Sequence, residues 1–175
     1  GKINIEGDAQ HNTRVHGGEH RAILAYCAEH YAQWREELGV DLPFGSFGEN
    51  LAVAGWHEDN ACIGDVYRIG DTVRVQVSQP RQPCDNIYRH LGIRGIGKQV
   101  MRAMRTGWYL RVLETGDIEA GMPVMLEERT HPTWTIRAAH EAMNERGRNP
   151  QRAHALAEVE ALEPKWRDKL AKAGL

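Results

Sequence analysis

The stretch Thr72-Val-Arg-Val-Gln-Val-Ser-Gln-Pro80 has the pattern of a half-buried β-strand. Its three valines alternate with polar residues, and successive side chains of a strand point to opposite faces of a sheet. The segment before it, Cys-Ile-Gly-Asp-Val-Tyr-Arg-Ile-Gly (62–70), has a similar character and is separated from it by Gly70-Asp71. A Gly-Asp pair is typical of a tight turn, so the two segments predict an antiparallel hairpin.

Further strands are predicted on the C-terminal side of this hairpin, at 108–114 and 123–128. Many short strands with glycine-rich turns favour a barrel or a sandwich. Helices are predicted at about 29–38, where Gly39 ends the helix, and at about 96–105. By propensity alone, residues 22–26 would extend the first of these helices.

The chain from about residue 135 onward is rich in alanine and predicts three short helices. Thr135 is a candidate N-cap of the first helix. Asn149 precedes Pro150, a cap followed by proline at the first helical position. Pro164 begins the third helix. The tail is predicted either to pack on the rest of the protein or to form a homodimer contact.

Composition restricts the class of protein. The chain has 175 residues, 41% of them hydrophobic and 26% charged, which fits a globular domain with a small appendage. The net charge of −2 argues against a strongly basic nucleic-acid binder. No apolar run reaches the roughly 18 residues of a membrane span. Three cysteines without a CxxC pair exclude a disulfide scaffold and a cysteine-rich metal site, and they predict a reducing, cytoplasmic setting.

Residues 14–21 gather basic side chains around a glycine pair: Arg14, His16, Gly17, Gly18, His20 and Arg21. Glycines let backbone N–H groups turn toward an anion, and guanidinium groups bind phosphate. The segment therefore suggests a ligand with a phosphate group, although an ordinary surface turn has the same composition. Zinc binding by the two histidines is disfavoured, because the glycines interrupt the helix that such a pair needs.

Ser-Gln-Pro-Arg-Gln-Pro-Cys (78–84) follows the predicted central strand directly. Pro80 and Pro83 end the ladder and stiffen the loop. Arg81 lies three residues before Cys84, and a nearby cation favours the thiolate, which is the nucleophilic and metal-binding form. Cys84 is therefore a candidate functional thiol, with a buried packing residue as the alternative. The other two cysteines lie among apolar residues and are interpreted as packing residues.

A third candidate segment is Phe-Gly-Ser-Phe-Gly-Glu-Asn-Leu (44–51). Its glycines and asparagine suit a loop that turns backbone groups toward a ligand, or an ordinary turn that enters a strand. Glu49 is a candidate acid, base or ion-pair partner for an arginine. By contrast, His30, Tyr31 and Trp34 have helical spacing and indicate a core stripe rather than ligands.

Five segments occur in an informative order: EGDAQHNTRVHGG (6–18), SFGENLAVAGW (46–56), CIGDVYRIG (62–70), VSQPRQPC (77–84) and TGWYLRVLETG (106–116). Together they resemble the MOSC domain, named for the C-terminal domain of molybdenum cofactor sulfurase. His131-Pro-Thr-Trp-Thr135 and the helical tail resemble the small stand-alone bacterial branch of that family. The resemblance implies a mainly β fold with helices. Its β-barrel core would cover 1–130 and a three-helix subdomain 131–175.

The resemblance also changes two structural expectations. It implies that residues 22–26 form a strand, against their propensity. It further implies that barrel strands precede Gly1.

The site residues follow from the same resemblance. It implies binding of the molybdenum cofactor, a pterin with a phosphate tail, with Cys84 as the ligand of molybdenum. Cofactor binding would fall to the residues that match the family's motifs: Arg14, His16, Gly17, Gly18, Arg21, Gly48, Asn50 and Arg81. Glu49 or His16 would orient the substrate or relay protons.

The implied activity is reduction of N-hydroxylated compounds, including hydroxylaminopurine-type base analogues. Three cysteines cannot hold a four-thiolate [2Fe–2S] cluster, so an external flavin or iron–sulfur reductase would supply electrons. Two alternatives remain open. Cys84 could carry sulfur as a persulfide. The protein could also bind and deliver the cofactor without turnover.

Overall fold

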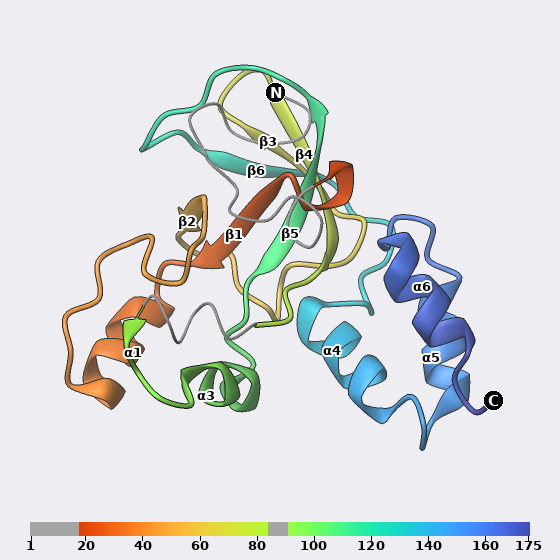
Figure 1. The fold of residues 1–175 in the computed structure, drawn as a ribbon. Coiled ribbons are helices and arrows are strands. Elements are labelled where there is room, and N and C mark those ends of the chain that lie inside the picture. Colours follow the sequence, from red (N-terminus) through yellow and green to blue (C-terminus); the bar gives the residue numbers. More distant parts are fainter. Residues whose placement is uncertain (1–17, 84–90) are drawn as a thin grey trace.

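The computed structural model describes residues 18–83 and 91–175. The strands of these residues form one mixed sheet in the order β2-β1-β5-β4-β3-β6. The sheet curves into a half-barrel, with β3, β4 and β6 stacked above β1 and β2 in Figure 1. The strands are β1 (Ile23–Cys27), β2 (Leu51–Val53), β3 (Val66–Ile69), β4 (Val73–Pro80), β5 (Trp108–Glu114) and β6 (Val124–Glu128).

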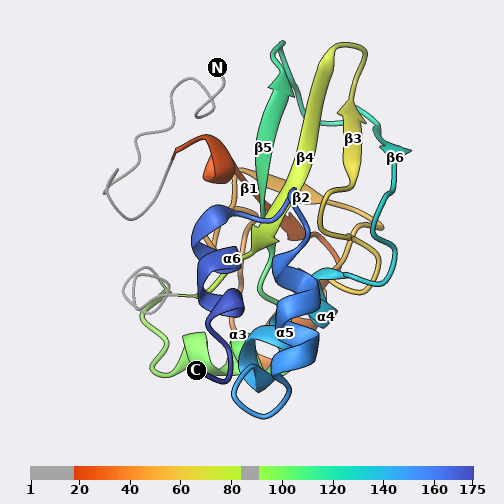
Figure 2. The same ribbon diagram turned by 90° about the vertical axis from the view of Figure 1, so that its right-hand side faces the viewer.

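The helices lie in two groups at one end of the sheet (Figures 1 and 2). The first group lies beside β1 and β2, and the second is formed by the C-terminal part of the chain. The elements are a short 3-10 turn, η1 (Glu19–Arg21), and the helices α1 (His30–Leu38), α3 (Ile96–Ala103), α4 (Ile136–Glu145), α5 (Pro150–Ala157) and α6 (Pro164–Ala171). None of the helices in the described ranges is long and apolar enough to cross a membrane.

The predicted central hairpin is confirmed. β3 and β4 pair antiparallel, with Ile69 opposite Val73 and Tyr67 opposite Val75. Gly70 has a φ of +59°, the left-handed conformation that a tight turn requires. The valines of β4 are buried, which explains the alternation in the sequence.

β1 is a strand, as the family resemblance implied and as propensity did not. It pairs antiparallel with β5, where Leu24 lies opposite Tyr109, and parallel with β2, where Ala25 lies opposite Leu51. All five of its residues are buried. A strand that is buried on both faces has a continuous run of apolar residues. This explains why the segment lacks the alternation of apolar and polar residues that predicts a strand.

The helix starts in the C-terminal region follow the predicted caps. Thr135 Oγ1 accepts from the N–H of Ala138 at 3.1 Å. Asn149 Oδ1 accepts from the N–H of Arg152 at 3.1 Å, ahead of Pro150. α6 also begins with proline, and the residue before it, Glu163, is its cap. Each side chain satisfies a backbone donor that the first helical turn leaves without a partner.

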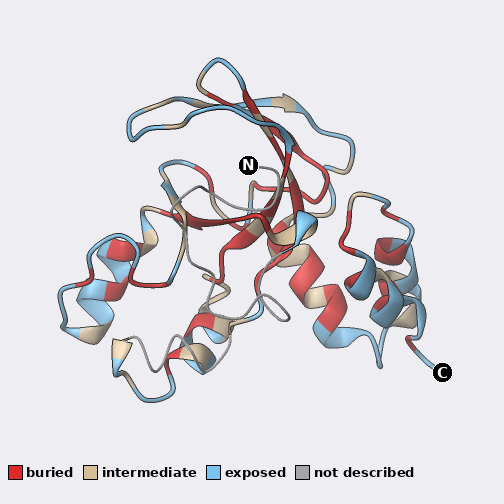
Figure 3. Ribbon diagram, turned by 45° about the horizontal axis from the view of Figure 1, so that its top comes forward, coloured by how far each residue is buried: buried red, intermediate tan, exposed pale blue. Residues whose placement is uncertain are grey.

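Two apolar clusters form the core, and Figure 3 displays their buried segments in red. The larger cluster joins the sheet to α4, α5 and α6 through residues such as Val77, Leu110 and Leu156. The smaller cluster packs α1 and α3 against Tyr26 of β1. The larger cluster therefore contains residues from both sides of position 130. The division of the chain into a domain at 1–130 and a subdomain at 131–175 stays a prediction.

The mainly β fold with helices is confirmed, and in the described residues the sheet has two edges, β2 and β6. An apolar cavity of about 740 Å³ lies between them. Residues of β2, the segment 118–123 and the first residue of β6 line it. The expectation of barrel strands before Gly1 stays a prediction.

Candidate functional site

The candidate site lies at the end of β4, where the ladder stops at Pro80. Proline has no N–H to continue a sheet, so the chain leaves it here, as predicted. Arg81 is still tied to the neighbouring segment, because its N–H donates to the carbonyl oxygen of Gly107 at 3.0 Å. The loop toward Cys84 therefore leaves the sheet from a fixed backbone position.

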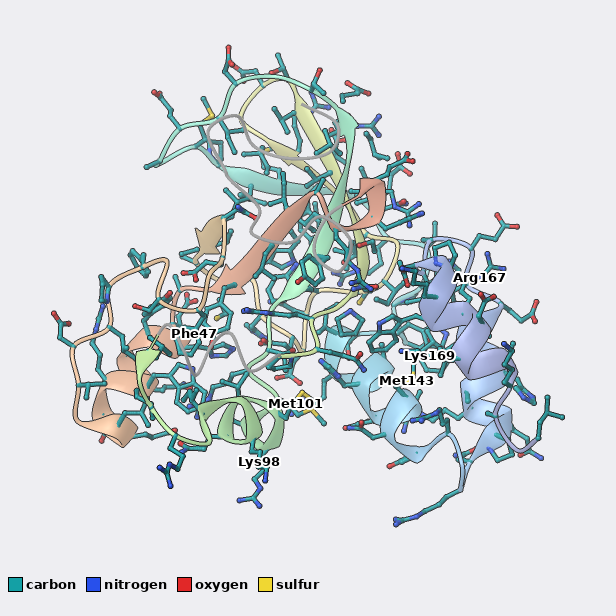
Figure 4. All side chains as sticks on the ribbon, in the orientation of Figure 1. Phe47, Lys98, Met101, Met143, Arg167 and Lys169 are labelled. Carbon is teal, nitrogen blue, oxygen red and sulfur yellow. The ribbon has the colours of Figure 1, made fainter. Side chains whose placement is uncertain are left out.

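The side chain of Arg81 brings two predicted motifs together. Its guanidinium Nη1 donates to the backbone oxygen of Phe47 at 2.6 Å. A Cβ atom built on Gly48 would lie 3.9 Å from Nη2 of Arg81, so the two residues are in close contact. Arg81 is only 8% exposed. The Gln-Pro-Arg and Gly-Glu-Asn segments thus form one side of the same site, and Figure 4 places Phe47 near α1.

Glu49 is held by α1 and by its own loop. Its Oε1 accepts from the hydroxyl of Tyr31 and from the N–H of Gly45, the latter at 2.8 Å. Its Oε2 is buried and has no hydrogen-bond partner in the described structure. Burial and the hydrogen bond to Glu49 both raise the pKa of Tyr31, which therefore stays a proton donor. This arrangement fits a carboxyl group with one fixed oxygen and one oxygen left for another partner.

Asn50 connects the same loop to β1. Its Oδ1 accepts from the N–H of Leu24 at 2.8 Å, and its own N–H donates to the Leu24 carbonyl at 2.9 Å. This exchange fixes the loop before β2 begins at Leu51. Asn50 therefore orders the site through the backbone.

Gly18 and Arg21 lie at η1, which contacts β4 and β5. Gly18 has a φ of +89° and precedes the 3-10 turn. The Arg21 guanidinium lies 5.8 Å from the ring centre of Tyr109 and 3.7 Å from Glu163. Tyr109 is opposite Gln79 in the sheet, and directly opposed side chains share a face. Arg21 is thereby placed near the Gln-Pro-Arg segment.

Gln79 belongs to the same motif and is 2% exposed. Its Oε1 is buried without a hydrogen-bond partner among the described residues. His20 lies nearby, since its carbonyl accepts from the hydroxyl of Ser78 at 2.5 Å. Burial, and then the charge of Arg111, lower the pKa of His20, so its imidazole is neutral near pH 7.

Four of the predicted site residues lie outside the described residues: Arg14, His16, Gly17 and Cys84. Their proposed roles stay predictions. Within the described ranges, no group of three or more histidine, cysteine, aspartate or glutamate side chains is placed to hold a metal ion.

The other two cysteines are buried, as predicted. Cys27 is 2% exposed, and burial together with a hydrogen bond to Glu29 raises the pKa of its thiol to about 12. Cys62 is 1% exposed, and burial also raises its pKa. Both thiols stay protonated near neutral pH, which makes them poor nucleophiles.

Sequence reasoning missed two residues of this region, Tyr31 and Tyr109. Tyr31 is 1% exposed and belongs to the smaller core cluster, as its helical spacing predicted. Its hydroxyl nevertheless reaches Glu49, and nothing in the spacing indicates that contact. Tyr109 alternates with buried residues of β5. This pattern predicts which face of the sheet Tyr109 lies on, but it does not predict that Tyr109 lies near Arg21.

The chain is similar to known proteins in both sequence and structure. Residues 12–125 match the family model of the MOSC domain. The chain is 38% identical over 169 residues to the uncharacterized protein YflK of Bacillus subtilis, covering 97% of this chain and 76% of YflK. It is 35% identical over 141 residues to protein YiiM of Escherichia coli, covering 79% of this chain and 62% of YiiM. It is 38% identical over 135 residues to a protein of Gibberella moniliformis named reductase, covering 75% of this chain but only 24% of that protein.

Solved structures agree with the sequence match. The crystal structure of YiiM from Geobacillus stearothermophilus is similar with a TM-score of 0.86 and 35% identity, covering 90% of this chain and 80% of the other. The crystal structure of YiiM from Escherichia coli is similar with a TM-score of 0.85 and 28% identity, covering 99% and 83%. The chain therefore belongs to the MOSC domain family.

Proposed function

We propose that this protein binds the molybdenum cofactor and reduces N-hydroxylated compounds to the corresponding amines. Membership of the MOSC family and the relative named reductase support an oxidoreductase. The observation that carries the proposal is the buried guanidinium of Arg81, held against Phe47 and Gly48 three residues before Cys84. Arg81 would favour the ionised, metal-binding form of the Cys84 thiol, because a nearby cation lowers the pKa of a thiol.

The residues present fit such a cofactor. Gln79 Oε1 is a buried acceptor without a partner among the described residues, and a pterin carries N–H donors that suit it. Gly18 and Arg21 continue the basic segment that begins at Arg14 in the sequence, and the basic residues of that segment would join them in holding a phosphate. Cys84 would be the molybdenum ligand, since a thiolate is a soft ligand suited to a transition metal.

When bound, the cofactor would supply the two-electron chemistry that breaks the N–O bond. The overall reaction converts an N–OH group, two electrons and two protons into an N–H group and water. An external flavin or iron–sulfur reductase would provide the electrons. The protein must therefore hold the substrate and deliver protons.

Glu49 is suited to the proton delivery. Tyr31 and the Gly45 N–H fix its Oε1, which leaves Oε2 to hold a proton or to orient the substrate. His16 remains the alternative for this role. Arg81 would bind the cofactor rather than the substrate, because its guanidinium is buried against the Phe47 carbonyl.

The proposal is tested with protein purified from cells that make the cofactor. It is assayed with 6-hydroxylaminopurine and an artificial electron donor, and production of adenine is the expected result. Glu49→Gln is expected to lower the rate strongly, whereas Glu160→Gln, an exposed surface change, is not. Protein that contains molybdenum but never turns over would indicate a carrier. A persulfide mass on Cys84 without molybdenum would indicate sulfur transfer.

A further inference from the structure

The segment 91–105, which contains α3, carries a local positive charge on a chain whose net charge is −2. It has no aspartate or glutamate, and its basic residues are Arg94, Lys98, Arg102 and Arg105. Arg105 pairs with Glu37 of α1 at 2.8 Å. The other three are exposed and form no ion pair with any residue that the structure describes. We call Lys98 and Arg102, together with Arg94 just before the helix, the basic face of α3.

The basic face is not what stabilises the helix. Lys98 and Arg102 lie four residues apart, where like charges on a helix repel each other. Lys98 is also in the first turn, where the helix dipole disfavours a cation, and that turn has no acidic residue. The opposite face of α3 buries Ile96 and Val100. The apolar face therefore accounts for the packing of α3, and the exposed cations are available to a partner.

The buried face of α3 packs beside the candidate site. Ile96 and Val100 belong to the smaller core cluster, which also contains Phe47. The backbone oxygen of Phe47 accepts from the guanidinium of Arg81 at 2.6 Å. In Figure 4, Lys98 lies on the side of α3 that faces away from the sheet. The basic face is therefore the outer surface of a helix whose inner surface supports the neighbourhood of Arg81.

The proposed reaction needs a partner that brings electrons. A flavin hydroquinone releases two electrons and two protons when it is oxidised to the flavin, which is what one N–O bond consumes. Complexes that transfer electrons are weak and small, so a few opposite charges are enough to steer them together. Nucleic-acid binding uses more phosphate contacts than three cations supply. The charge of α3 therefore favours an acidic redox protein over a nucleic acid.

We propose that the basic face of α3 is the docking surface of the electron donor, and that this donor is a small acidic flavin protein. The inference rests on the proposed function, which requires an external donor. In the overall reaction the flavin hydroquinone is oxidised to the flavin, and its two electrons and two protons convert the N–OH group into N–H and water. Lys98 and Arg102 would orient the acidic surface of the donor against the helix.

The test compares two double charge reversals. One joins Lys98→Glu to Arg102→Glu on α3, and the other joins Lys165→Glu to Lys169→Glu on α6. Lys165 and Lys169 are also exposed and four residues apart, but α6 belongs to the C-terminal group of helices, where Lys169 is labelled in Figure 4. Protein from cells that make the cofactor is assayed with 6-hydroxylaminopurine. The donor is either a bacterial flavodoxin, kept reduced by NADPH and its reductase, or reduced methyl viologen.

At low ionic strength the α3 double variant is expected to lose about tenfold in kcat/KM for flavodoxin. Its rate with methyl viologen should stay at the wild-type value, because a small artificial donor needs no docking surface. The α6 double variant should match wild type with both donors. Added salt should lower the wild-type kcat/KM for flavodoxin toward that of the α3 variant, since salt screens exposed charges. If the α3 reversal does not fold, Lys98→Ala joined to Arg102→Ala should show a smaller loss of the same kind.

Equal losses in the two double variants would overturn the proposal, as would an unchanged kcat/KM for flavodoxin in the α3 variant. A fall in the methyl viologen rate of the α3 variant would also overturn it, because the change would then act on the site itself. A DNA duplex that binds wild type but not the α3 variant, with flavodoxin kinetics unchanged, would assign the basic face to nucleic acid instead.

The proposed function fails on a different result. If wild-type protein does not reduce 6-hydroxylaminopurine with methyl viologen, the proposed function is contradicted. Titration calorimetry of flavodoxin into the purified wild-type protein and into both double variants would still decide whether the basic face binds it. Binding that is lost only in the α3 variant would support the docking surface, and equal binding by all three proteins would contradict it.

Discussion

The guanidinium of Arg81 donates to the backbone oxygen of Phe47 at 2.6 Å, across 34 positions of the sequence. This bond joins the end of β4 to the loop that carries Gly48 and Glu49. A planar guanidinium reaches a buried carbonyl with a fixed geometry that the single ammonium of lysine does not reproduce. The relationship therefore predicts that the identity of this cation matters, and not only its charge.

Arg81→Lys is expected to lower the free energy of unfolding by about 1.5–3 kcal/mol, because a buried carbonyl loses its charged donor. Molybdenum content should fall as well. Chemical denaturation and elemental analysis check the two effects. Arg68→Lys is the control, since Arg68 pairs with Glu127 on the exposed face of β3, where such a pair contributes little. Normal molybdenum content in Arg81→Lys would show that Arg81 is not needed to bind the cofactor.

Tyr31→Phe removes only the hydroxyl that holds Glu49. The expected loss of stability is about 1 kcal/mol, and the rate of hydroxylamine reduction should fall by about tenfold because the carboxyl loses its fixed orientation. Tyr67→Phe is the matched control: its hydroxyl binds Asp65 at 3.2 Å, away from this loop. Steady-state kinetics and denaturation of both variants provide the comparison. A similar drop in rate for both would show that the Tyr31 hydroxyl has no special role.

Part of the fold could be predicted from local patterns. The alternation of valines predicted β4, and Thr135 and Asn149 predicted the starts of α4 and α5. β2 was missed, because it is a three-residue edge strand without a pattern of its own. β1 was predicted only through the family resemblance. All of its residues are buried, so it lacks the alternation of apolar and polar residues by which a strand is predicted.

The motifs of the candidate site were predicted one by one from the sequence. That they come into contact in the folded protein was not predicted. The contact of Arg81 with Gly48 depends on how the end of β4 meets a loop 33 residues earlier, which no local signal encodes. Tyr31 was assigned to the core by its helical spacing. It does pack there, but its hydroxyl serves the site. His140 gave no signal either, because its hydrogen-bond partner is the hydroxyl of Thr106, 34 positions away in the sequence.

Gly107→Ala is expected to destabilise the protein by more than about 3 kcal/mol. Gly107 has a φ of +74°, and a Cβ atom there would lie 2.5 Å from the backbone oxygen of Ala25. Gly121→Ala separates the backbone strain of a positive φ from the steric clash of the added Cβ. Gly121 has a φ of +92°, but no atom lies within 4 Å of the added Cβ. It should lose only the strain of the left-handed conformation, about 1–2 kcal/mol. Urea denaturation measures both, and equal losses would rule out the clash.

Acid should destabilise the protein partly through His140. Its pKa is lowered from an ordinary 6.5 to about 4 by burial, so between these values the unfolded chain binds a proton that the native state does not. Stability is therefore lost as pH falls from about 6.5 toward 4, by up to about 3 kcal/mol for this group. His140→Leu should flatten this part of the stability–pH curve, while His154→Gln, at an exposed position, should not. Parallel curves for wild type and His140→Leu would contradict the assignment.

We propose that the thiolate of Cys84, three residues after Arg81 in the sequence, holds molybdenum. The most direct measurement is elemental analysis of protein made in cells with intact cofactor synthesis, comparing wild type with Cys84→Ser. About one molybdenum atom per wild-type chain is expected, and almost none in Cys84→Ser. Full molybdenum content in Cys84→Ser would contradict it, as would a wild-type protein that contains none.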